Sequence, residues 1–203
     1  MDKKSQIIAS ATELFARKGF EGTSIRDIAS QAGVNLAMIN YYFGSKEKLF
    51  EAVMVSDSEY MLAIYKELAD RQDMLTIDKV YAVIDYHVEK LMRKREFHKL
   101  LHHEIMLNQR MEVSDIIRDI IKKNKTLLSQ IVNDGIIKGE FRQVDVALTM
   151  SLIFGTINQL FLSKTICNVV LDNNDCTKDP FTPELKDRVV VFMKDVMQRI
   201  LLK

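Results

Sequence analysis

The chain has 203 residues, of which 47% are hydrophobic and 28% charged, so it is neither a disordered nor a fibrous sequence. Its formal net charge of +1 excludes a strongly basic protein that binds nucleic acid with its whole surface, so any DNA contact must come from a local patch. No apolar run approaches the about 20 residues that span a membrane, and residues 1–5 carry charged side chains instead of a secretory signal, so we expect a cytoplasmic protein.

Local preferences favour helix along the chain. Only two prolines and seven glycines interrupt a sequence rich in leucine, isoleucine, alanine, lysine and glutamate. This composition predicts an all-α fold. Cys167 and Cys176, the only cysteines, are too few for a disulfide scaffold or a structural zinc site, and a redox-sensing pair is the less favoured alternative.

The first predicted helix covers residues 3–18. Asp2 is suited to cap its N-terminus, and Gly19 to end it, because glycine readily adopts the left-handed conformation found after helices. Apolar side chains recur with helical period on one face, namely Ile7, Ile8, Ala11, Leu14 and Phe15. We expect this face to pack against neighbouring helices.

Two short helices are predicted next, at 25–31 after Ser24 and at 36–42 after Asn35. The turn between them contains a glycine, and this pattern is typical of a helix-turn-helix unit. Residues 1–50 contain seven basic and five acidic side chains, so the basic excess of the chain lies in this part.

Longer helices follow. One is expected from Ser45 to about Asp70, and apolar periodicity predicts others near residues 76–94, 96–108, 113–138, 143–165 and 184–202. The last has the clearest start, because Thr182 can cap it and Pro183 suits its first position.

Two sequence segments carry a family resemblance. Residues 22–34 read GTSIRDIASQAGV and residues 39–50 read INYYFGSKEKLF, and with the earlier LFARKGF at 14–20 they resemble the TetR/AcrR family of transcriptional regulators. The resemblance implies a three-helix, helix-turn-helix DNA-binding domain over residues 1–48, followed by a helical ligand-binding and dimerisation domain over residues 49–203. It further implies a repressor, not an enzyme, that a small-molecule inducer releases from a palindromic operator in double-stranded DNA.

Other functions remain open at this point. The regulator is alternatively an activator, or is controlled by a protein partner instead of a small molecule. A helical enzyme or metal-binding protein is less favoured, because the sequence has no Ser/His/Asp set, phosphate-binding glycine loop or inward Glu-x-x-His pair. We expect no cofactor.

The second helix of the unit is expected to enter the major groove, where its first two turns reach base edges. The residues on these turns are Asn35, Leu36, Ala37, Asn40 and Tyr41. Asn40 stands where the family commonly has tyrosine, and Leu36 where it often has a polar residue. Arg26 matches a family position that often touches DNA. Four further side chains can donate to phosphates: Thr23, Ser24, Tyr42 and Lys46.

A ligand pocket is predicted from aromatic, methionine and histidine residues in the middle of the chain. Its candidate residues are Tyr81, His87, Phe97, His98, His102 and Met106. Ordinary core packing is the alternative for most of them. His98 and His102 lie four residues apart and, with His87 and Glu104 nearby, allow a metal site in principle, but we predict none because the ligands form no clear converging set.

The two C-terminal helices, near 143–165 and 184–202, carry apolar residues over more of their circumference than one buried stripe needs. The resemblance implies that they form a homodimer by packing against the same helices of a second chain. Complete burial within one chain is the alternative.

Overall fold

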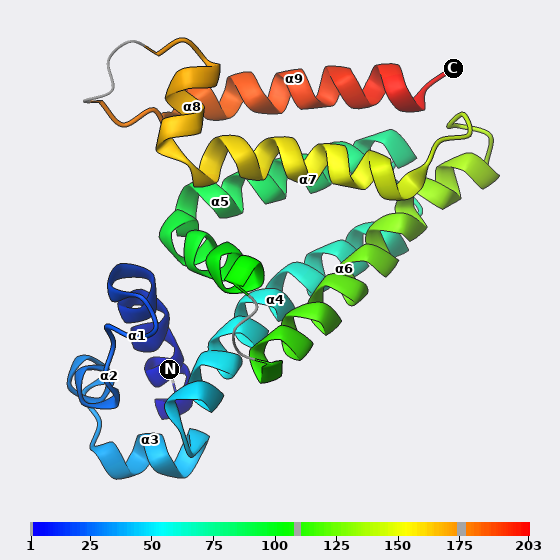
Figure 1. Ribbon diagram of the computed structural model, residues 1–203. Coiled ribbons are helices and arrows are strands. Elements are labelled where there is room, and N and C mark those ends of the chain that lie inside the picture. The colour runs from blue at the N-terminus through cyan, green and yellow to red at the C-terminus, as the bar shows by residue number, and fades with distance from the viewer. Residues whose placement is uncertain (1, 108–110, 174–177) are drawn as a thin grey trace. The chain divides into compact units, whose positions relative to one another are not determined.

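The computed structural model describes residues 2–107, 111–173 and 178–203 (Figure 1). In chain order they form α1 (Lys3–Lys18), α2 (Ile25–Ala32), α3 (Leu36–Phe43), α4 (Lys46–Asp70), α5 (Thr76–Leu107), α6 (Met111–Ile137), α7 (Val146–Leu162), α8 (Lys164–Val170) and α9 (Pro183–Leu201). No strand is assigned in these three ranges, which confirms the all-α class. Cys176, and with it the possible thiol pair, lies outside the described residues.

The helix ends in the first part of the chain agree with the sequence prediction to within one residue because local capping determines them. Asp2 Oδ1 accepts the Ser5 N–H at 2.7 Å and starts α1. Ser24 Oγ accepts the Asp27 N–H at 3.1 Å, while the Asp27 carboxylate accepts the Ser24 N–H at 3.2 Å. This reciprocal capping box starts α2.

Two differences from the prediction lie further along. α5 is assigned as one helix, and its break falls at Lys94 (φ −127°, ψ 32°), where two separate helices were expected to meet. α8 was not predicted at all. Ser163 adopts an extended conformation after α7, and its Oγ accepts the Ile166 N–H at 3.2 Å to begin α8.

The chain forms two compact units. The first unit contains Met1–Leu62 and Glu96–Lys123, and the second contains Ala63–Arg95 and Asn124–Lys203. The core of the first unit joins α1, α2, α3 and the start of α4 to Phe97 and Ile117. The predicted division at residue 48 separates a DNA-binding domain from a ligand-binding and dimerisation domain by function, and it stays a prediction.

The second unit is held together by apolar packing and by ion pairs. Many of its buried residues come from α5, α6, α7 and α9, among them Ile84, Val88, Ile131, Ile153, Ile157, Phe161, Met193 and Met197. Lys186 Nζ lies 2.6 Å from Glu89 Oε2, and Lys194 Nζ lies 2.7 Å from Asp85 Oδ2, so α9 is tied twice to α5. The Arg142 guanidinium donates to the carbonyls of Arg199 and Ile200 and so caps the end of α9.

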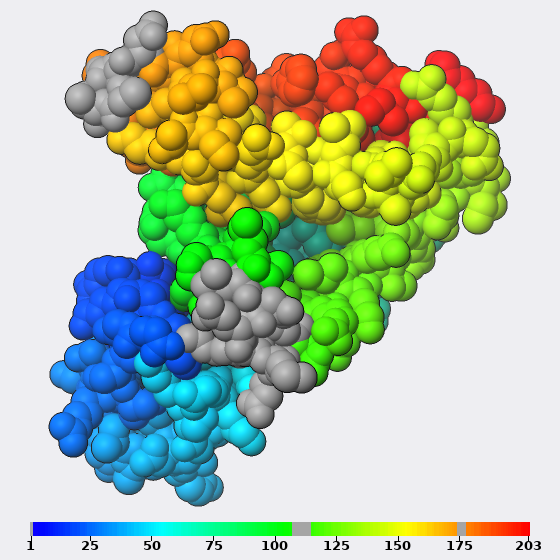
Figure 2. Space-filling model, viewed as in Figure 1, coloured from blue at the N-terminus to red at the C-terminus, as the bar shows by residue number. Residues whose placement is uncertain are grey.

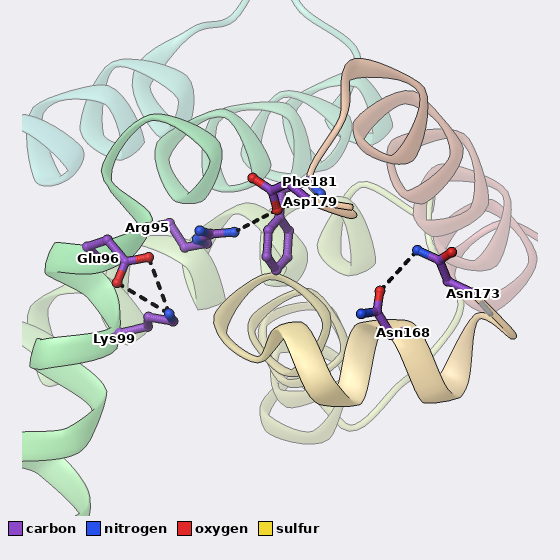
Figure 3. A network of polar contacts seen from close by, with 7 residues as sticks. All are labelled: Arg95, Glu96, Lys99, Asn168, Asn173, Asp179 and Phe181. Carbon is purple, nitrogen blue, oxygen red and sulfur yellow. Dashed lines mark hydrogen bonds and ion pairs between the residues drawn. The ribbon is translucent and has the colours of Figure 1, made fainter. Parts of the chain in front are cut away.

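The segment before α9 contacts α5 next to its break, as Figure 3 shows. The Arg95 guanidinium lies 3.9 Å from the Phe181 ring centroid, and its Nη1 lies 3.5 Å from Asp179 Oδ1. The same Asp179 oxygen accepts the Phe181 N–H at 3.3 Å. At the end of α8, the Asn173 amide donates to Asn168 Oδ1 at 3.0 Å.

No single helix among the described residues combines the length and apolar composition of a membrane span, and α7 and α8 meet those limits only when joined across their 105° bend.

Candidate nucleic-acid interface

The α2-turn-α3 unit is fixed at its turn and at both ends of α3. Gly33 (φ 61°) ends α2 in the left-handed conformation, where Val34 N–H donates to Ala29 O at 3.0 Å. Asn35 Oδ1 then accepts the Met38 N–H at 2.8 Å and starts α3. Gly44, also at positive φ, ends it. The chain reversal therefore rests on contacts made within residues 24–44.

α3 has a buried face and an exposed face. Ile39 and Phe43 are buried in the core of the first unit. Tyr41 is 84% exposed. The other candidate base-reading residues, Asn35, Leu36, Ala37 and Asn40, are also exposed. An exposed aromatic ring beside amide side chains is suited to base edges, although the reading role of these residues stays a prediction.

The two asparagines of this face differ in what they have left to offer. Asn35 Oδ1 is engaged by the helix cap, so its amide nitrogen is its available donor. Asn40 caps nothing and is exposed. Bidentate pairing with adenine needs both the oxygen and the nitrogen of the amide. Asn40 therefore suits that contact better than Asn35.

The polar residues around α2 and the start of α4 are placed at the surface. Arg26 and Ser24 are exposed in or before the first turn of α2, and Tyr42 is exposed on α3. Ser24 Oγ accepts from Asp27, so its own hydrogen stays able to donate. Lys46, the first residue of α4, is half-buried with Nζ 4.2 Å from the Phe20 ring centroid.

An acidic group also lies close to these donors. Asp27 accepts from the Ser24 N–H and lies 3.5 Å from Lys18 Nζ. The backbone hydrogen bond from Ser24 is the main reason why the pKa of Asp27 is below its ordinary value. Asp27 is thus ionised near neutral pH and balances Lys18.

Thr23 is a correction to the predicted phosphate contacts. Its side chain is 1% exposed, and its hydroxyl lies 2.8 Å from Gly19 O and 3.2 Å from Leu14 O. Since a hydroxyl has a single hydrogen to donate, Thr23 ties the α1–α2 connection to the end of α1 and does not offer a donor to DNA.

The predicted pocket residues fall into both compact units. Tyr81 and His87 belong to the second unit, where His87 Nε2 lies 2.8 Å from Asn158 Oδ1 and its ring packs edge-on against Phe154. The remaining four, Phe97, His98, His102 and Met106, belong to the first unit.

Two of these four do not behave as pocket walls. Phe97 is buried in the core of the first unit, which gives it a packing role, and Met106 is 84% exposed. His98 is buried with Nε2 3.8 Å from Asp57 Oδ2, and His102 is half-buried. Within the described part of the chain no three His, Cys, Asp or Glu side chains converge as a metal site requires.

The C-terminal helices separate their apolar residues onto two faces. Ile153 and Ile157 of α7 and Met193 and Met197 of α9 are buried. The exposed set on the same two helices is Leu148, Leu152, Val191 and Phe192. Figure 2 shows both helices, α7 in yellow and α9 in orange to red, at the surface of the second unit.

Two family models match the chain. The model described as bacterial regulatory proteins, tetR family, matches residues 7–53, and the model described as YsiA-like protein, C-terminal region, matches residues 50–175. The second match alone covers more than half of the sequence. The chain belongs to the TetR family.

Similar proteins agree with this TetR assignment. The fatty acid metabolism regulator protein of Bacillus subtilis (strain 168) is 32% identical over 162 residues, which cover 77% of this chain and 80% of that protein. The transcriptional repressor NicS of Pseudomonas putida is 33% identical over 152 residues, covering 72% and 68% of the two chains. These relatives are transcriptional regulators, not enzymes.

Solved structures support the same TetR fold. FadR from Bacillus subtilis, in complex with stearoyl-CoA, matches with a TM-score of 0.71 at 25% identity over 93% of this chain and 96% of that one. FadR from Bacillus halodurans matches with a TM-score of 0.74 at 22% identity over 96% and 95%, a likeness of fold alone. The prediction of a DNA-binding transcriptional regulator of the TetR family is confirmed.

Proposed function

We propose that this TetR-family regulator is a repressor that binds a palindromic operator as a homodimer and leaves it when a small-molecule inducer binds. Residues 1–48 bind DNA, and residues 49–203 bind the inducer and dimerise. The observation that carries the proposal is the two-faced α3, which buries Ile39 and Phe43 and leaves Asn40 and Tyr41 exposed between two fixed ends.

The exposed face of α3 reads the operator in this proposal. Asn40 pairs with adenine through both atoms of its amide, and Leu36 and Ala37 contact thymine methyl groups. Asn35 donates from its amide nitrogen, and Tyr41 contacts the base edges beside it. The favoured half-site therefore contains A·T pairs.

Phosphate contacts set the register of the helix in the groove. Ser24, Tyr42 and Lys46 donate to phosphates, and Arg26 reaches a phosphate or a guanine edge. The N-terminus of α4 adds to this surface, because the dipole at a helix N-terminus attracts anions.

The exposed apolar residues of α7 and α9 support the homodimer. Leu148, Leu152, Val191 and Phe192 together leave a large apolar area in contact with solvent on a single chain. A twofold axis buries the same surface on both copies and sets the two α3 helices for two half-sites about 34 Å, or a multiple of that, apart.

The inducer class follows from the relatives. One similar protein is a fatty acid metabolism regulator, and a similar structure holds stearoyl-CoA. A long-chain acyl-CoA is therefore the first ligand to test. Tyr81 and His87 of the second unit are the side chains proposed to contact it. The protein acts in the cytoplasm because its operator is there, and it is not an enzyme.

The test uses the purified full-length protein and the duplex upstream of its own coding region. We expect fluorescence anisotropy to show tighter binding to an inverted repeat than to a scrambled duplex. Stearoyl-CoA, but not coenzyme A alone, should release the complex, and in vitro transcription from the adjacent promoter should fall when the protein is added.

Matched variants connect the result to the proposed surface. Arg26→Ala should weaken operator binding about tenfold, since a charged hydrogen bond contributes about 1.5 kcal/mol or more, whereas the exposed Arg17→Ala on α1 should not. A monomer with no preference for the repeat would contradict the proposal. Increased transcription would indicate an activator, and release by a protein alone would indicate a partner-controlled regulator.

A further inference from the structure

Lys46 and Phe20 form a cation–π pair at the edge of the proposed phosphate surface. Lys46 Nζ lies 4.2 Å from the centroid of the Phe20 ring, well within the about 6 Å over which such pairs attract. Phe20 comes from the α1–α2 connection and Lys46 begins α4, so the contact joins two segments of the first unit.

The Phe20 ring is a fixed platform and not a mobile surface group. It is 6% exposed, stacks on Phe15 with centroids 5.6 Å apart, and meets Phe50 edge-on at 5.0 Å. Phe15 and Phe50 also pack edge-on against each other at 5.0 Å. Since three rings hold one another in the core, Phe20 cannot turn away from the lysine.

This platform constrains a side chain that would otherwise be mobile. A free lysine at a helix N-terminus samples many rotamers, and a phosphate contact must order it. Lys46 is half-buried over the ring before any DNA binds. Its ammonium carries three N–H donors, and donors directed away from the ring can reach a phosphate oxygen.

The neighbouring backbone is ordered as well. Ser45 Oγ accepts the Lys48 N–H at 3.2 Å, and Ser45 O accepts the Leu49 N–H at 3.0 Å. Both contacts fix the first turn of α4. The first turn of α4 therefore fixes the Cα of Lys46, while the Phe20 ring holds its ammonium.

We infer that Phe20 is a positioning residue for DNA binding, which holds the Lys46 ammonium ready for an operator phosphate. The inference rests on the proposed DNA surface. It gives a core aromatic residue, which touches no DNA itself, a measurable share of operator affinity.

A double-mutant cycle tests the inference. Phe20→Leu removes the ring and keeps an apolar side chain, and we expect it to raise the operator dissociation constant about two- to fivefold, the range of an exposed cation–π pair. In a Lys46→Ala background the same change should have no further effect, because two residues that act through one contact are not additive.

The salt dependence separates the roles of the two residues. Lys46→Ala should lower the slope of log affinity against log salt concentration by about one for each lysine lost. Phe20→Leu should weaken binding and leave the slope unchanged, because the phosphate contact is still made. Phe20→Tyr, which keeps the ring, should bind like the wild type.

The matched control is Phe97→Leu, which removes a buried ring from the core of the same unit but leaves in place the two rings that pack against Phe20. It should destabilise the protein in thermal melts as Phe20→Leu does, yet bind operator normally at 10 °C. In the free protein, the Lys46 ε-protons should show a ring-current shift that Phe20→Leu abolishes.

Three outcomes are decisive. Equal loss of affinity from Phe20→Leu with and without Lys46, or the same loss from Phe97→Leu, would overturn the inference in favour of a purely structural role. A wild-type protein that fails to bind any inverted repeat would instead refute the proposed function on which it rests.

Discussion

At the scale of single residues, the two asparagines on the exposed face of α3 have different roles. Asn35 caps the helix through Oδ1, whereas Asn40 has its whole amide available. We predict that Asn35→Ala lowers the free energy of unfolding by about 1 kcal/mol, the usual value of a lost N-cap, while Asn40→Ala leaves it unchanged. Chemical denaturation of both variants measures this difference.

Selection of operator sequences tests the proposed role of Asn40 in reading bases. Asn40→Ala should relax the preference for A·T at one position of the half-site. In the unfolding measurement, Asn35→Ser, which keeps the cap, should restore the stability that Asn35→Ala loses. A normal base preference in Asn40→Ala would contradict the adenine contact.

Residue exposure on α3 was predictable because helical period alone separates Ile39 and Phe43 from their neighbours. The burial of Thr23 was not. Its partners are the carbonyls of Leu14 and Gly19, and both lie at the end of a preceding helix whose carbonyls need donors. Only the turn geometry between α1 and α2 brings the hydroxyl to them.

At the scale of elements, the connection between α6 and α7 depends on a missing side chain. A Cβ on Gly135 would lie 2.3 Å from Cδ2 of the buried Phe141. We predict that Gly135→Ala lowers the free energy of unfolding by about 1–3 kcal/mol through overpacking. Adding Phe141→Leu should recover part of this loss. Thermal melts that show no recovery would contradict overpacking against Phe141 as its cause.

The ion pair between α5 and α9 should make stability depend on pH. The hydrogen bond from Lys186 is the main cause of the lowered pKa of Glu89, whose ordinary value is 4.5. A carboxyl with a lowered folded pKa stabilises the fold above its ordinary pKa and loses that contribution as pH falls through the folded pKa. Acid unfolding of wild type should therefore be steeper below pH 4.5 than that of Glu89→Gln.

This comparison has an internal control in Asp85→Asn, which breaks the parallel pair with Lys194. Between pH 6 and 8, Glu89→Gln should match wild type in the pH dependence of stability. Because both pairs are partly exposed, high salt should shrink the difference. A curve for Glu89→Gln that stays as steep as wild type would contradict the assignment.

Helix ends were predictable where a cap lies next to them, as at Asp2, Ser24, Asn35 and Thr182. α8 was missed because apolar residues continue across Ser163. The break at Lys94 has no proline or glycine within it, and the neighbouring Arg95 finds its partners in Asp179 and Phe181, more than eighty residues later. Such long-range contacts leave no trace in local sequence.

For the whole molecule, the proposed dimerisation is the property on which the proposed operator recognition depends. We predict that Phe192→Glu on α9 yields a monomer, because a charge on a side chain that is 57% exposed in one chain becomes buried in the pair. Light scattering measures the mass, and operator affinity should fall at least tenfold as one half-site contact is lost.

The control is Ile137→Glu at the end of α6, where an isoleucine is 82% exposed outside the proposed interface. It should remain dimeric and bind the operator. If Phe192→Glu is also dimeric, the exposed surface of α7 and α9 serves another contact.

The local anchoring of α3 has an evolutionary consequence. Its caps and its two core residues are separate from the side chains that face outward, so substitutions at Leu36, Ala37, Asn40 or Tyr41 leave the scaffold intact. If these side chains read the operator as proposed, copies of such a gene can acquire new target promoters one base at a time while the fold of α3 is kept.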